Sequence, residues 1–215
     1  MSVLDFGVEV IAISASGVLA PGPLFFTNLL YGTRQGARSG IKVAYGHTVV
    51  ELPLIIMLAA GLFASTATNQ YPGAIGLAGG IGILGFAGLQ IASVVSKRNV
   101  LAAPVMASDK SPFVAGIALS ALNPFFLLWW FTVGIKLIAD SATFGFAAGI
   151  MILFALHIWM DYVWLAGTAY VASKGRSVLK SKYYPLLLLA LAAVLLYYGI
   201  SFVLQSLYAI DLITT

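Results

Sequence analysis

Long apolar segments alternate with short polar ones along the whole chain. Each apolar segment exceeds the about 20 residues that an α-helix needs to cross the hydrocarbon core of a bilayer. We expect helices, because lipid offers no hydrogen-bond partner to exposed backbone groups. The predicted spans are residues 8–31, 41–65, 73–96, 112–135, 142–172 and 184–208, joined by connections at 32–39, 66–72, 97–111, 136–141 and 173–183.

Composition also indicates a membrane protein. Of the 215 residues, 61% are hydrophobic and 8% are charged, whereas a soluble domain carries about 25% charged residues. The mean hydropathy is +1.01. Six spans with short connections use up the chain, so we expect one transmembrane domain over residues 1–215. The absence of cysteine excludes a disulfide framework, thiolate metal ligands and a dithiol electron relay.

Lysine and arginine predict the orientation in the membrane. With six spans, nearly all of them fall on one side, and basic residues accumulate in cytoplasmic loops. The pattern therefore predicts both termini outside, and its short separate clusters argue against nucleic-acid binding. The cytoplasmic clusters are Arg34, Arg38 and Lys42, then Lys97, Arg98 and Lys110, then Lys174, Arg176, Lys180 and Lys182, which leaves Lys136 outside with Asp5, Glu9, Asp140 and Asp211.

Six spans divide into two halves of three, residues 1–100 and 103–215. An odd number of helices makes the second half enter the membrane upside down, as in an inverted repeat. Helix breakers stand at matching places, because Pro21-Gly22-Pro23 lies in the first span and Asn123-Pro124 in the fourth. We therefore predict an all-α integral membrane fold of six transmembrane helices, arranged as a 3+3 inverted repeat with broken helices 1 and 4.

Broken helices release backbone groups that can bind a solute. In inverted-repeat transporters, such groups form the substrate site near the bilayer midplane. We therefore expect the substrate site to include the breaker residues of both spans. For either break alone, the alternative is a proline kink whose free backbone groups are satisfied by neighbouring helices. The expected substrate-binding residues are Pro21, Gly22, Pro23, Asn123 and Pro124.

The only two histidines, His47 and His157, are each followed four residues later by an acid, Glu51 and Asp161. This spacing puts both members of a pair on one helical face. Both pairs lie in equivalent spans of the predicted repeat, and ionisable groups at membrane depth usually face a cavity or a relay. Because histidine changes charge near neutral pH, the pairs predict proton coupling or ion binding. The alternatives are simple interhelical pairing and a divalent-metal site of two imidazoles and two carboxylates.

Glycine is spaced for close helix packing. Small residues on one helix face let neighbouring helices approach each other closely. We expect these faces to pack helices, and a homodimer through them is the expected protein partner. The rows are Gly32, Gly36 and Gly40, and Gly76, Gly79, Gly80, Gly82, Gly85 and Gly88.

These motifs resemble a known family. The amino-terminal part, Ala20-Pro21-Gly22-Pro23 followed by Gly32, Gly36, Gly40 and Gly46, resembles the signature of the LysE/RhtB amino-acid exporters of the LysE superfamily. Residues 113–130, with Gly116 and Leu122-Asn123-Pro124, resemble the family's fourth-helix motif, and Asp161-Tyr162-Val163-Trp164 resembles its fifth-helix cluster.

The resemblance implies proton-driven efflux of amino acids or similar small solutes across a prokaryotic cell membrane. Glu51 and Asp161 match positions where relatives usually carry an acid, whereas His47 and His157 depart from the family pattern.

The expected function is therefore a secondary-active exporter of amino acids or related zwitterions, with the lipid bilayer and a small solute as partners and no cofactor. The alternative is an exporter of divalent transition metals that uses His47, Glu51, His157 and Asp161 as ligands. An intramembrane metallohydrolase is the third candidate. An enzyme is not expected, because the His-Glu-x-x-His signature is absent and the charged groups repeat by symmetry.

Overall fold

The computed structural model describes residues 2–20, 22–66, 72–96, 111–175 and 184–208, and all regular structure within them is helical. Four helical segments of this part of the chain are long and apolar enough to cross a membrane: Ala37–Leu62, Phe125–Phe144, Phe146–Ser173 and Leu188–Tyr208. A fifth crossing results if α1 (Val3–Val18) and α2 (Pro23–Gln35), bent by 71°, form one span. The all-helical membrane architecture is confirmed, and the six-span 3+3 repeat stays a prediction.

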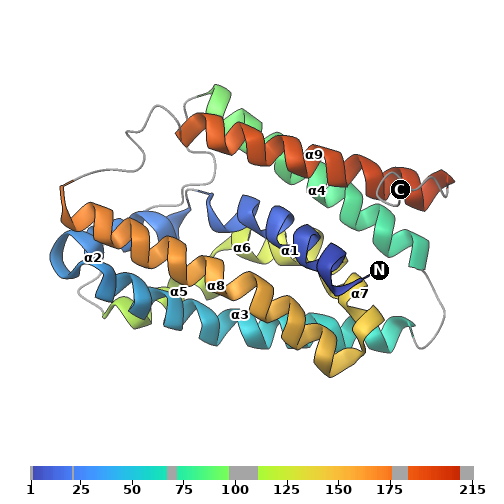
Figure 1. The fold of residues 1–215 in the computed structure, drawn as a ribbon, viewed down its shortest axis with the longest axis horizontal. Coiled ribbons are helices and arrows are strands. Elements are labelled where there is room, and N and C mark those ends of the chain that lie inside the picture. The colour runs from blue at the N-terminus through green and yellow to red at the C-terminus, as the bar shows by residue number, and fades with distance from the viewer. Residues whose placement is uncertain (1, 21, 67–71, 97–110, 176–183, 209–215) are drawn as a thin grey trace.

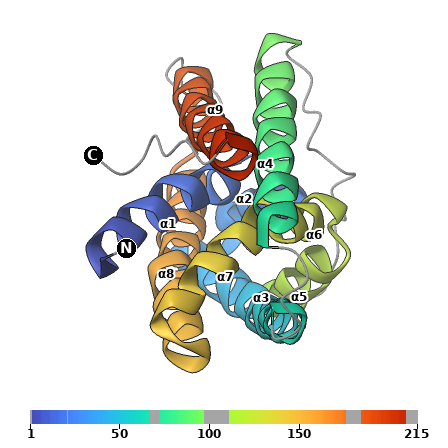
Figure 2. The same cartoon turned by 90° about the vertical axis from the view of Figure 1, so that its right-hand side faces the viewer.

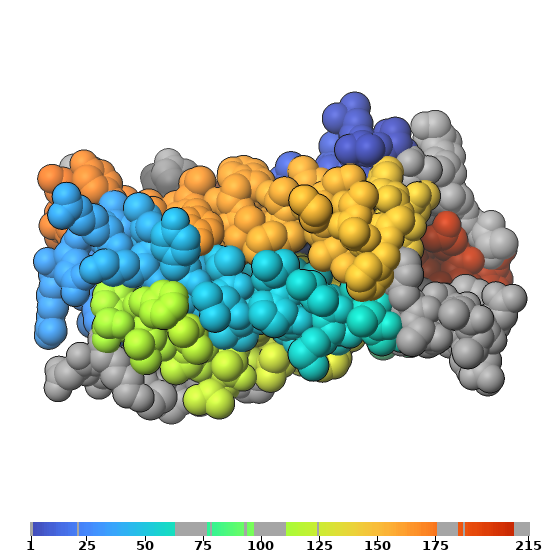
Figure 3. Space-filling view, turned by 90° about the horizontal axis from the view of Figure 1, so that it is seen from below, coloured from blue at the N-terminus to red at the C-terminus, as the bar shows by residue number. Residues whose placement is uncertain are grey.

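The long helices form an elongated bundle (Figure 1). Helices α4 and α9 lie side by side, and α3 packs against α5 and α8 (Figures 1 and 2). Seen from below, α2, α3, α5 and α8 make up much of one face (Figure 3). Their bounds are α3 (Ala37–Thr66), α4 (Pro72–Val95), α5 (Pro112–Ala121), α8 (Phe146–Ser173) and α9 (Tyr184–Tyr208).

Helices end at both predicted break positions. Helix α1 ends at Val18 and α2 starts at Pro23, while Pro21 lies outside the described residues. Helix α5 ends at Ala121, and α6 (Pro124–Trp129) follows it. The Asn123 side chain caps α6 by accepting a hydrogen bond from the backbone N–H of Phe125 at 3.0 Å. The interpretation of each helix pair as one broken span is still a prediction.

The predicted connection at 136–141 is wrong. Lys136 lies inside α7 (Ile135–Ser141), and its ammonium pairs with Asp140 one turn later. It also lies 3.8 Å from the centroid of the Phe202 ring. Pairing lowers the cost of placing charges in an apolar environment, so two charged residues here do not mark a loop. The segment Phe125–Phe144 is accordingly the crossing candidate, in place of the predicted span 112–135.

The predicted connection at 32–39 shrinks to a single residue. Gly36 has a φ of +62°, in the left-handed region that glycine adopts readily, and it separates α2 from α3. The segments 67–71, 97–110 and 176–183 of the other connections lie outside the described residues.

A π-helical turn, η1 (Trp130–Gly134), joins α6 to α7, and a 3₁₀ turn, η2 (Ala142–Phe144), follows α7. A Cβ added to Gly134 would collide with the Trp130 ring, so the glycine allows the indole to lie over the turn. Turns of this kind occur frequently at functional sites.

The predicted glycine rows pack helices only in part. Gly32, Gly40, Gly80 and Gly82 lie tightly against neighbouring helices, whereas a Cβ added to Gly85 or Gly88 would meet no described atom within 4 Å. A Cβ added to Gly46 of α3 would collide with the backbone of Phe113 and Gly116 in α5, and one added to Gly40 would collide with the backbone of Leu165 in α8. These contacts bring α3 very close to two neighbours. The homodimer through the glycine-rich faces remains a prediction.

Candidate functional site

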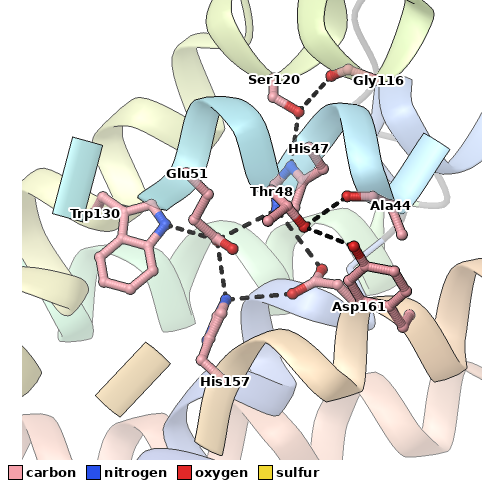
Figure 4. A network of polar contacts seen from close by, with 10 residues as sticks. Ala44, His47, Thr48, Glu51, Gly116, Ser120, Trp130, His157 and Asp161 are labelled. Atoms are coloured by element: carbon pink, nitrogen blue, oxygen red, sulfur yellow. Dashed lines mark hydrogen bonds and ion pairs between the residues drawn. The ribbon is translucent and has the colours of Figure 1, made fainter. Parts of the chain in front are cut away.

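The centre of the bundle brings both histidine–acid pairs into one cluster, shown in Figure 4. Within α3, His47 Nε2 lies 3.2 Å from Glu51 Oε1. Within α8, His157 Nε2 lies 3.4 Å from Asp161 Oδ2. Each four-residue spacing thus produces a side-chain contact along one helical face.

The two pairs also contact each other across the α3–α8 interface. His157 Nε2 lies 3.1 Å from Glu51 Oε1, and His47 Nε2 lies 3.8 Å from Asp161 Oδ1. None of the four side chains belongs to a residue more than 6% exposed. We call these four residues the His/acid cluster: each imidazole contacts both carboxylates in a site removed from bulk water.

Two residues that the sequence analysis did not select support this cluster. Trp130 Nε1 donates a hydrogen bond to Glu51 Oε1 at 3.1 Å, and Ser120 Oγ lies 2.7 Å from His47 Nδ1. Both lie within the motif at 113–130, yet nothing in the local pattern indicates that they point at an acid or a histidine of α3.

The hydrogen bonds of Ser120 determine which ring nitrogen of His47 carries a proton. Ser120 donates its single hydroxyl hydrogen to the carbonyl of Gly116 at 2.7 Å, so its oxygen accepts from His47 Nδ1–H. A neutral His47 then presents the lone pair of Nε2 to the carboxylates of Glu51 and Asp161. The contacts are therefore favourable only when a further proton, or another cation, lies between His47 and these carboxylates.

A cavity of about 100 Å³ adjoins the cluster. One water needs about 10–15 Å³ by this measure, so the cavity has room for several waters or one small solute. Aromatic side chains form much of its wall, and Gly22 and Asn123 line it too. Among its lining residues are Phe25, Phe86, Phe125, Phe126, Trp129, Trp130 and Trp164, together with the whole His/acid cluster.

The two predicted breaks therefore meet at this cavity. A Cβ added to Gly22 would lie 4.0 Å from Asn123 Nδ2. Pro23 is buried without lining the cavity, Pro124 begins α6, and Pro21 lies outside the described residues. The structure thus brings one residue from each break beside the cluster.

Several polar atoms of the cavity lining have no hydrogen-bond partner among the described residues. They are Glu51 Oε2, His157 Nδ1 and the indole nitrogen Nε1 of Trp129, and all three are buried. Buried polar groups normally have partners, so these atoms are suited to bind water or a ligand. The carboxylate oxygen can accept from an ammonium group, and the indole N–H can donate to a carboxylate.

Helix α2 is fastened beside the site by a buried amide. Asn28 Nδ2 donates to the carbonyl of Leu165 at 2.8 Å and to Thr168 Oγ1 at 3.0 Å, both in α8. Asn28 gave no signal in the sequence, because a single asparagine within an apolar span has no pattern that identifies its partner.

Part of the cluster has a composition that can hold a metal ion. His47, Glu51 and Asp161 each offer a ligand atom, and these atoms lie within 4.8 Å of one another. Imidazole and carboxylate ligands suit manganese, iron, cobalt and zinc. His157 contacts both carboxylates but lies outside this set of three, so the structure brings together three of the four ligands that the sequence predicted.

Comparison with known proteins gives one match. The model of a family described as LysE type translocator matches residues 15–206, a range that contains the His/acid cluster and both breaks. No curated protein and no solved structure matches the chain.

Proposed function

This chain belongs to the LysE type translocator family, and from that premise we propose that it is a secondary-active, proton-coupled exporter of amino acids or related zwitterionic solutes. The observation that carries the proposal is the buried His/acid cluster at the wall of a solute-sized cavity. Ionisable groups in such places usually belong to a transport pathway. Since members of this family are transporters, we propose no enzymatic activity.

The cavity offers groups of both kinds that a zwitterion requires. The free oxygen Glu51 Oε2 can accept hydrogen bonds from a solute ammonium group, and Trp129 Nε1–H can donate to a solute carboxylate. The amide of Asn123 lines the same cavity and adds a further donor and acceptor. The size of the cavity favours a small solute.

Coupling of solute transport to protons follows because His47 and the two acids require a cation between them. In the absence of solute, a proton lies between His47 Nε2 and the carboxylates of Glu51 and Asp161. A solute ammonium group that reaches the same carboxylates competes with this proton. Because binding of each cation weakens binding of the other, the site carries them alternately, which is the basis of antiport.

The direct test is transport by the purified protein in proteoliposomes with an imposed pH gradient. The panel should contain small zwitterionic, cationic and uncharged solutes. We expect at least one zwitterion to accumulate against its gradient and to leak back when a protonophore collapses the pH difference. Failure of every zwitterion to move, with or without the gradient, would contradict the proposal.

The metal alternative deserves a separate test because three ligand atoms already converge. If the cluster holds a divalent cation, manganese or zinc should bind the purified protein in a one-to-one ratio and release protons. Binding should disappear in His47→Ala and persist in Asp5→Asn, which changes an exposed acid of α1. Calorimetry in two buffers of different ionisation enthalpy measures both quantities. Metal binding that survives His47→Ala would exclude the cluster as the metal site.

Orientation can be tested with single cysteines, because the natural chain has none. We propose that the amino terminus and η2 lie outside and the end of α8 lies inside. Ser2→Cys and Thr143→Cys should therefore react with an impermeant maleimide on intact cells, and Lys174→Cys should react only after permeabilisation. All three positions are exposed. Reaction of Lys174→Cys alone on intact cells would reverse the orientation.

A further inference from the structure

A second buried acid lies away from the His/acid cluster. Glu9 of α1 is only 6% exposed, and its Oε1 atom has no hydrogen-bond partner within the part of the chain that the structure describes. It shares a helix face with Phe6, Val10 and Ile13, which are fully buried. Glu9 is one of the acids that the charge pattern predicts to lie on the outer side. Within the protein it is buried where α1 packs against α7, α8 and α9.

A carboxylate and an ammonium of α7 accompany Glu9. The Glu9 carboxyl is close enough to hydrogen-bond with the Asp140 side chain. Asp140 also pairs with Lys136, whose ammonium lies 3.8 Å from the centroid of the Phe202 ring. Tyr198 of α9 is near enough to feel the charge of Glu9 but is not hydrogen-bonded to it among the described residues. The group therefore consists of two acids and one base.

Two carboxyl groups in contact, one buried and the other half-buried, cannot both be ionised without a large electrostatic cost. Lys136 neutralises one of them, and no described residue donates a hydrogen bond to Glu9 Oε1. We propose that Glu9 and Asp140 share one bound proton and form a second proton site. With one proton on the pair and one positive charge on Lys136, the three side chains carry no net charge.

The position of this site gives it a place in transport. Lys136 and Asp140 follow Trp130 by six and ten residues, and Trp130 contacts Glu51. At about 1.5 Å per residue, they lie about 9 and about 15 Å beyond that contact along the helix. Helix α7 and the amino terminus lie at the end of the bundle opposite α2 (Figure 1). The last turn of α2 carries Arg34, one of the residues predicted to be cytoplasmic.

That end is the outer one under the orientation proposed above. A proton arriving from outside would reach Glu9 and Asp140 before it reaches the His/acid cluster. This role in transport rests on the proposed function, whereas the shared proton does not.

Infrared spectroscopy of the purified full-length protein at neutral pH tests the shared proton. A protonated carboxylic acid gives a C=O stretching band that a carboxylate lacks. We expect the wild-type protein to show a band that disappears in Glu9→Gln and also in Asp140→Asn, because the remaining acid then ionises beside Lys136. The same band should persist in Asp5→Asn, Glu51→Gln and Asp161→Asn.

Two outcomes would overturn the proposal. If Glu9→Gln loses no part of the C=O band, Glu9 is ionised in the wild-type protein. Loss in Glu9→Gln but retention in Asp140→Asn would mean that Glu9 is protonated by burial alone. Lys136→Met is the second variant. Removal of the ammonium should leave the band in place, because ionisation of both carboxyl groups is even less favourable without the positive charge of Lys136. Thermal unfolding in detergent verifies that each variant is folded.

A transport measurement separates this proposal from the proposed function. In proteoliposomes, Glu9→Gln should slow solute accumulation driven by the pH gradient and leave solute exchange at the wild-type rate. Wild-type accumulation by Glu9→Gln would exclude a role of the second proton site in transport. If the protein transports no zwitterion at all, the proposed function fails, while the infrared result still decides whether the second proton site exists.

Discussion

Glu51→Gln and Asp161→Asn are each expected to abolish solute accumulation driven by a pH gradient while solute exchange continues. The amide keeps the shape of the acid, and its oxygen still accepts a hydrogen bond from a solute ammonium group, but it cannot release a proton. Removing a group that transfers a proton typically lowers a rate by about 100-fold or more. Proteoliposomes measure both activities on the same preparation, with and without the gradient.

The matched variants for this experiment are Asp5→Asn and Asn123→Ala. Asp5 is an exposed acid in the first turn of α1, so its replacement should leave accumulation unchanged. Asn123 caps α6 and lines the cavity, so Asn123→Ala should weaken solute binding and lower exchange and accumulation together. If both acid variants keep full accumulation, the cluster is an interhelical contact or a metal site and not a proton relay.

Gly46→Ala is expected to destabilise the protein strongly. The new Cβ would overlap with the backbone of Phe113, Gly116 and Ile117 in α5, and backbone atoms cannot rotate away. Helices α3 and α5 would have to separate, at a cost of about 1–3 kcal/mol or more in the free energy of unfolding. Thermal unfolding of the purified protein in detergent measures this loss.

The same helix provides the control. A Cβ added to Gly61 meets no atom within 4 Å, so Gly61→Ala should be neutral, or stabilising by up to about 1 kcal/mol from helix propensity. Separation of α3 and α5 should also lengthen the contact between His47 and Ser120, because His47 follows Gly46 directly. Wild-type stability of Gly46→Ala would show that α3 and α5 are not in close backbone contact.

The local parts of the site could be predicted from the sequence. A spacing of four residues sufficed to predict that His47 contacts Glu51 and that His157 contacts Asp161, because helix geometry alone sets these distances. Apolar length predicted α8 and α9 closely, since lipid admits helices and little else.

The other contacts depend on which helices become neighbours and how each is rotated. Nothing near Trp130 or Ser120 in the chain indicates that they contact Glu51 and His47, which lie more than 70 residues away. Similarly, charge at 136–141 suggested a loop, because the sequence does not reveal that Lys136 meets the Phe202 ring of α9.

The π-helical turn η1 also determines how far α7 is rotated about the helix axis relative to α6. Each residue of an α-helix rotates the chain by about 100°, and a π turn holds one residue more than an α turn. Everything after Gly134 is therefore rotated by about that angle relative to an uninterrupted helix, and this rotation directs Lys136 and Asp140 toward Glu9. Deleting one residue from the turn would restore the α-helical phase, turn Asp140 away from Glu9 and so take the second proton site apart without changing either of its carboxyl side chains.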